Sequence, residues 1–141
     1  MIDLNYSCFK DVLLYIKNKI EIPTYVDNPN PISFIDICND SKLSSSYPKT
    51  QIRYTLKKLE EIEFISCHGC AKRSKTSSGG EFVDDITMKG YDFIINSMNE
   101  RIWKKTINTS NTVGMISFNS FCKLMDRIAV KLSIDCIKKT S

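Results

Sequence analysis

The clearest structural pattern in the sequence is the stretch Tyr47-Pro-Lys-Thr-Gln-Ile-Arg-Tyr-Thr-Leu-Lys-Lys-Leu59. Its apolar residues Ile52, Leu56 and Leu59 recur at steps of four and three, the spacing that gathers side chains on one face of a helix. Pro48 suits the first position of a helix, where a missing backbone N–H costs nothing. The stretch therefore predicts a helix that packs one apolar face against a core.

The opposite face of this predicted helix is basic. A rotation of about 100° per residue turns that face away from the apolar stripe. The outward face and its edges comprise Lys49, Thr50, Arg53, Tyr54, Lys57 and Lys58. Arg53 can donate two hydrogen bonds to O6 and N7 of guanine, whereas lysines suit phosphates. These residues are candidate DNA contacts, and the alternative is an ordinary solvated helix face.

Positive charge is concentrated in blocks along the chain. The 141 residues include 20 Lys and Arg against 16 Asp and Glu, which gives a net charge of +4. Residues 42–58 hold five basic residues and no acid, and residues 72–75 hold three more. Glu60, Glu61 and Glu63 follow the first block and would repel a phosphate backbone near the end of the helix. The placement of charge, more than its sum, indicates a nucleic-acid partner.

Elements of alternating type surround the central helix. Apolar residues at helical spacing predict a helix over residues 6–20, and β-rich runs predict strands over 32–38, 64–70 and 82–86. Residues 41–46 are polar and are expected to form a loop or a short irregular helix. Helix, strand, helix, strand, loop, strand is the order of a winged-helix module, in which one helix is the usual DNA reader.

The segment between the last two predicted strands would be the wing of such a module. It is polar, and it carries Lys72, Arg73 and Lys75. Basic side chains on a wing beside the reading helix suit phosphate contacts. We therefore add these three residues to the candidate DNA-binding set.

The remainder of the chain predicts helices. Thr87 is a candidate N-cap of one helix, residues 101–107 continue or restart it, and Ser117 caps a last amphipathic helix. The apolar and basic residues of this last region are compatible with three roles: packing onto the first domain, a homodimer seam through the C-terminal helices, or an extension of the phosphate-binding surface by basic residues such as Arg101, Lys104 and Lys105. The candidate seam residues are Phe118, Phe121 and Met125. We expect a winged-helix domain over 1–88 and a helical C-terminal extension over 89–141, packed on it.

Nothing in the sequence indicates catalysis, a metal or a cofactor. The motif Cys67-His68-Gly69-Cys70 offers metal-ligand spacing, but a structural zinc needs four ligands and no second such pair exists. Asp84 and Asp85 are neighbours in a predicted strand, so they are expected to point to opposite faces and not to work as an acid–base pair. We predict no enzymatic activity, no catalytic residue, no metal site and no cofactor.

The composition predicts a cytoplasmic protein with no membrane partner. No stretch approaches the roughly 20 apolar residues that cross a bilayer, and the start of the chain lacks the pattern of a signal peptide. The six cysteines are scattered through apolar patterns, which favours reduced thiols in a cytosol.

Four segments carry a resemblance to a known family. Residues 47–59, 86–94, 102–106 and 116–118 resemble, in order, the signatures of small phage and prophage proteins of low-GC Gram-positive bacteria. That family is catalogued only as a domain of unknown function. The resemblance covers most of the chain beyond Ile32, and it implies a winged-helix start, a helical tail and an origin in a mobile element of a bacterial host. It implies no activity.

The sequence departs from that family at the start of the central helix. This start is commonly acidic in the family, whereas here it carries Pro48, Lys49 and Arg53. We therefore predict an α+β winged helix-turn-helix protein that binds double-stranded DNA as a small phage-type transcriptional regulator. The alternative is a winged-helix module for protein interaction, such as a phage-encoded inhibitor of a host defence or replication protein.

Overall fold

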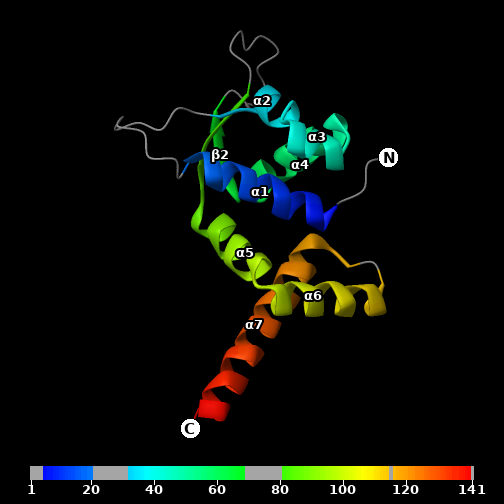
Figure 1. The fold of residues 1–141 in the computed structure, drawn as a ribbon, viewed down its shortest axis with the longest axis vertical. Coiled ribbons are helices and arrows are strands. Elements are labelled where there is room, and N and C mark those ends of the chain that lie inside the picture. Colours follow the sequence, from blue (N-terminus) through cyan, green and yellow to red (C-terminus); the bar gives the residue numbers. More distant parts are fainter. Residues whose placement is uncertain (1–4, 21–31, 69–80, 115, 141) are drawn as a thin grey trace. The chain divides into compact units, whose positions relative to one another are not determined.

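The computed structural model describes residues 5–20, 32–68, 81–114 and 116–140 (Figure 1). The chain divides into two compact units, Met1–Tyr91 (unit 1) and Asp92–Ser141 (unit 2). Unit 1 combines helices with a small antiparallel sheet, whereas the described part of unit 2 is helical. The protein therefore belongs to the α+β class.

Unit 1 is built around one central helix. Its elements are α1 (Tyr6–Ile20), β1 (Ile32–Ser33), α2 (Phe34–Cys38), α3 (Ser41–Ser46), α4 (Lys49–Glu61), β2 (Ile65–His68) and β3 (Phe82–Ile86). Both α1 and α2 pack against α4, and Ile52, Leu56 and Leu59 are fully buried there. The predicted helix and its apolar stripe are confirmed. Pro48 is the N-cap residue rather than the first helical residue.

A three-stranded antiparallel sheet completes unit 1, with strand order β1-β3-β2. In the register, Ile32 faces Val83 across the first pair, and Ile65 faces Ile86 across the second. The antiparallel pairing of the segments before and after residues 69–80 agrees with the sequence prediction. The described strand β2 is shorter than the predicted 64–70, because Phe64 belongs to the turn and residues 69 and 70 lie outside the described residues.

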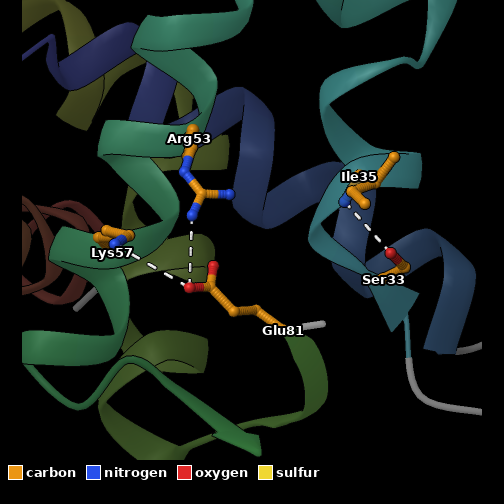
Figure 2. Close-up of polar contacts among 5 residues, drawn as sticks. All are labelled: Ser33, Ile35, Arg53, Lys57 and Glu81. Atoms are coloured by element: carbon orange, nitrogen blue, oxygen red, sulfur yellow. Dashed lines mark hydrogen bonds and ion pairs between the residues drawn. The ribbon is translucent and has the colours of Figure 1, made fainter. Parts of the chain in front are cut away.

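The predicted strand over 32–38 is wrong beyond Ser33. The Ser33 hydroxyl accepts a hydrogen bond from the backbone N–H of Ile35 at 3.2 Å and so caps α2 (Figure 2). Phe34 and Ile37 are buried, whereas Ile35 is 62% exposed. A spacing of three between buried residues is helical, and the apparent alternation around Asp36 concealed it. Residues 41–46 form α3, capped by Asp40.

The strand β3 contains a β-bulge at the adjacent acids Asp84 and Asp85, so it is not the regular strand that the prediction of opposite faces assumes. Ser66 pairs with Asp85 and Cys67 pairs with Val83, so Asp84 is an extra residue in β3. In a regular strand these two neighbours would point to opposite faces. The bulge leaves both carboxylates exposed, while Val83 and Ile86 on either side are buried.

The helix α5 (Met88–Met98) begins in unit 1, and its residue Gly90 lies close to the backbone of Phe64. The Thr87 hydroxyl accepts a hydrogen bond from the backbone N–H of Gly90 at 3.2 Å, which confirms Thr87 as the predicted cap. A methyl group at Gly90 would collide with the carbonyl oxygen of Phe64 and with the Ile86 side chain. Glycine therefore allows this helix to approach the end of the sheet.

Unit 2 contains the later part of α5 with α6 (Glu100–Val113) and α7 (Phe118–Thr140). Phe93 and Trp103 stack edge to face at 6.4 Å, and Trp103 meets Phe121 in the same way at 5.9 Å. Phe121 and Met125 are fully buried in this unit. The predicted homodimer seam is therefore wrong for these two residues, because the fold of the single chain already covers them. None of the helices in the described ranges has the length and apolar character to cross a membrane.

Two caps set the ends of these helices, as the sequence indicates. The Ser117 hydroxyl accepts a hydrogen bond from the backbone N–H of Ser120 at 3.1 Å, which confirms its predicted role. Asn99 separates α5 from α6, so residues 101–107 belong to a restarted helix.

Replacing Asn99 with alanine should lower the free energy of unfolding of unit 2 by about 1 kcal/mol. The Asn99 side-chain oxygen accepts hydrogen bonds from the backbone N–H groups of Arg101 and Ile102, at 3.1 and 3.2 Å. Urea unfolding followed by the fluorescence of Trp103, the single tryptophan of the chain, measures the change. Asn99→Ser should retain most of the stability, and an equal loss in both variants would contradict the capping role.

Candidate nucleic-acid interface

The exposed face of α4 is the candidate interface. Lys49, Thr50, Arg53 and Lys57 are exposed, and Tyr54 and Lys58 are half-buried. These six residues therefore lie together on the side of α4 opposite its buried stripe, as the helical spacing predicted. We call them the α4 basic face. The other three candidates, Lys72, Arg73 and Lys75, lie outside the described residues.

Glu81 contacts the α4 basic face and was absent from the sequence prediction. Its Oε1 lies 3.4 Å from a terminal guanidinium nitrogen of Arg53 and 3.9 Å from Nζ of Lys57. Figure 2 shows both cationic side chains directed from α4 toward this carboxylate. Glu81 is held in place by its backbone, because its carbonyl oxygen accepts a hydrogen bond from the N–H of Phe34 at 2.9 Å.

The three charged groups differ in their access to water. The Arg53 and Lys57 side chains are 50% and 56% exposed, whereas that of Glu81 is 20% exposed. The second carboxylate oxygen of Glu81 is buried and has no hydrogen-bond partner among the described residues. A buried carboxylate oxygen that lacks a hydrogen-bond partner is unfavourable, because it has lost its hydration without compensation. Arg53 and Lys57 remain accessible to a second anion from solvent.

Lys58 contacts an acidic and an aromatic side chain of its own helix. Its Nζ lies 3.0 Å from a carboxylate oxygen of Glu61, one turn further on, and 5.5 Å from the centre of the Tyr54 ring. The hydrogen bond from Lys58 to Glu61 is the main reason that the pKa of Lys58 is raised. Lys58 therefore stays charged, and the Glu61 carboxylate at the acidic end of α4 offsets part of that positive charge.

The field of the basic face extends to the thiol of Cys38 at the end of α2. Burial raises the pKa of Cys38, and the charges of Arg53 and Lys49 oppose that rise. Glu81 acts in the same direction as burial, but its effect is the smallest of the four. The charges of Arg53 and Lys49 therefore each affect the pKa of Cys38 more than the charge of Glu81 does.

The motif containing Cys67 and His68 lies at the end of β2. The His68 Nδ1 is 2.6 Å from a carboxylate oxygen of Asp84, and its ring stacks on Phe82 with centres 5.0 Å apart. Cys70 lies outside the described residues. Within the described ranges, no three side chains of the metal-binding types gather at one point. The arrangement holds the imidazole against the bulge in β3.

Comparison with known proteins identifies the family. A family model described as a hypothetical protein family, DUF2513, matches residues 3–116, which include the whole α4 basic face. The chain belongs to the DUF2513 family. This confirms the resemblance to a domain of unknown function that residues 47–59 first indicated. No curated protein and no solved structure matches the chain.

The DUF2513 match covers only some of the helices of unit 2. It includes α6 and ends before α7. The family description names no activity, so the function of this DUF2513 protein has to be argued from its own residues. The phage origin implied by the resemblance stays a prediction.

Proposed function

We propose that this protein is a winged-helix module that binds double-stranded DNA and places α4 in the major groove. The element order supports this proposal: a helix, a short strand, further helices, and then two antiparallel strands, the second of which also pairs with the first strand of the unit. In winged-helix modules the last helix before the strand pair is the usual reader. In this chain that helix is α4.

The observation that carries the proposal is that Lys49, Thr50, Arg53 and Lys57 are exposed on α4, while the apolar stripe of the same helix is buried. A helix with one packed face and one exposed basic face can enter a groove about 12 Å wide without loss of core contacts. We assign base contacts to Arg53, with Thr50 and Tyr54 beside it. Lys49 and Lys57 are assigned to phosphates, together with Lys72, Arg73 and Lys75 of the predicted wing.

A small transcriptional regulator is the role that we propose for this binding. A single module with few base contacts buries a small interface and gives modest specificity. In this proposal residues 1–88 form the reading module, and the helices from residue 89 onward extend it.

Fluorescence anisotropy with a random duplex of about 25 base pairs tests the proposal. Titrations at several salt concentrations should give a log–log slope of about −4 to −5, the value for the phosphates assigned to these five basic residues. A preferred sequence can then be selected from a randomised duplex library. Absence of binding at 50 mM salt or below would refute the proposal, because any basic groove retains DNA under that condition.

Protein interaction is the second candidate, and Glu81 is the observation that favours it. A carboxylate that contacts both Arg53 and Lys57 reduces the positive charge offered to DNA. A mixed surface of this kind also suits a folded protein partner. The two candidates make opposite predictions for the removal of this charge.

Replacing Glu81 with glutamine should strengthen DNA binding about three- to tenfold at low salt, because one negative charge beside the phosphates is lost. The measurement is anisotropy with the same duplex and wild-type protein in parallel. Glu100→Gln, at the start of α6, removes an equal charge outside unit 1 and controls for net charge. Unchanged or weaker DNA binding in the Glu81 variant would favour the protein-interaction candidate.

A further inference from the structure

A cavity of about 310 Å³ lies in unit 1, between α1 and α3. Its lining includes Asp11 and Tyr15 from α1, and Asp40, Lys42 and Tyr47 around α3. The lining contains none of the residues of the α4 basic face. The cavity combines carboxylates with aromatic rings, whereas that face is cationic. It is therefore suited to a different ligand.

The carboxylates of Asp11 and Asp40 each accept hydrogen bonds at one oxygen only among the described residues. The Tyr47 hydroxyl donates a hydrogen bond to Oδ2 of Asp11 at 2.6 Å. Oδ2 of Asp40 accepts from the backbone N–H groups of Lys42 and Leu43, at 3.2 and 3.0 Å. Within the described residues, Oδ1 of each aspartate has no hydrogen-bond donor. The cavity thus offers two fixed carboxylates, each with an available acceptor.

The pKa values of the two tyrosines in the lining are raised, in part by nearby carboxylates. Burial raises the pKa of Tyr15, and the charges of Asp40 and Asp36 add to the rise. Burial also raises the pKa of Tyr47, together with its hydrogen bond to Asp11. Both phenols therefore stay neutral at physiological pH. Lys42 is the cation among the lining residues; it is exposed and forms no ion pair with either carboxylate in the described structure.

We propose that this cavity binds a guanidinium group, carried either by an arginine side chain or by a small free guanidine. A guanidinium presents five N–H donors in a plane, which is enough to donate to both carboxylates of the lining at once. Its flat faces can stack on a tyrosine ring, and it loses less hydration on burial than an ammonium group. One face of the Tyr15 ring is already approached by Lys19, whose Nζ lies 5.5 Å from the ring centre, so a guanidinium would stack on the other face or on Tyr47. A volume of about 310 Å³ is at the small end of ligand sites, which fits a group of side-chain size.

Titration of the full-length ¹⁵N-labelled protein, followed by amide chemical shifts, tests the proposal. The probes are agmatine, the peptide acetyl-Ala-Arg-Ala-amide and its lysine counterpart. Shifts should be confined to residues around the cavity, and the lysine peptide should bind at least fivefold more weakly than the arginine peptide. Agmatine bound as tightly as the arginine peptide identifies a free guanidine as the source, whereas tighter binding of the peptide identifies a protein side chain.

Neutral variants separate the site from general charge attraction. Asp11→Asn and Asp40→Asn keep an acceptor for the existing hydrogen bonds but remove one charge each, and each should weaken binding of the arginine peptide about tenfold. Lys42→Ala should strengthen it about two- to threefold, because a like charge is removed. Asp85→Asn, an exposed acid of β3 outside the cavity, should change nothing. Equal binding of the lysine peptide, or no localised shift at 10 mM agmatine and peptide, would overturn the proposal. Neither result affects the DNA proposal, which concerns other residues.

Discussion

Replacing Arg53 with alanine should lower affinity for a selected DNA site about 10- to 100-fold and should relax the base preference at one position. A bidentate contact from arginine to guanine contributes about 1–3 kcal/mol of discrimination. Arg53 is half exposed on the α4 basic face, and its contact with Glu81 leaves donors available. Binding of wild type and variant to the selected site and to its single-base variants, at one fixed salt concentration, measures both effects.

Arg101→Ala is the matched control, because Arg101 is an exposed arginine in the first turn of α6. Its loss removes the same charge, so it can lower affinity on every sequence but should leave the base preference unchanged. If Arg53→Ala weakens all sequences equally, Arg53 contacts a phosphate and the base-reading role is wrong. Retained affinity and preference in Arg53→Ala would exclude α4 as the reader.

The sequence was sufficient where local spacing and burial agree. The helix at residues 49–61 has an apolar stripe with one period and one packed face, so its presence and its basic face followed from the printed residues, although its first residue is Lys49 and not Pro48. The same holds for α1, which spans the predicted 6–20. In each case a single helical repeat accounts for all the buried side chains.

Short elements were harder to predict, because a few residues fit two periods. Residues 34–38 fit a strand by composition, but a cap from Ser33 and the burial of Phe34 and Ile37 produce a helix. The bulge at Asp84 depends on pairing with β2, which no local pattern encodes. Tertiary context decided both cases.

The residues of the α4 basic face could be predicted from the sequence, but the carboxylate that contacts them could not. Glu81 is 28 positions from Arg53 in the chain, and it reaches α4 only because the sheet brings the start of β3 beside the helix. A charge count over consecutive residues cannot include such a neighbour. The cavity between α1 and α3 was missed for the same reason, since Asp11 and Tyr47 meet only through the fold.

The strongest effect on stability is expected from Phe121. Replacing Phe121 with alanine should lower the free energy of unfolding of unit 2 by about 3–5 kcal/mol, the usual cost of deleting a buried aromatic ring. Phe121 is fully buried, and its ring contacts Trp103 at 5.9 Å and Phe118 at 6.4 Å between centres. Because Trp103 is the single tryptophan, its fluorescence in urea reports this loss within unit 2.

Two further variants keep this prediction testable if Phe121→Ala does not fold. Phe121→Leu preserves most of the apolar volume and should cost about 1 kcal/mol. Phe118→Ala removes a half-buried ring from the same cluster and should cost less than Phe121→Ala, because its site is open to water. Far-ultraviolet circular dichroism reports helix in both units, so a loss confined to unit 2 would shift the fluorescence transition and leave a second, unshifted phase in the dichroism. A cost below 1 kcal/mol for Phe121→Ala would mean that the aromatic cluster does not form the core of unit 2, and the surface offered by α7 would then include the residues first considered for a homodimer.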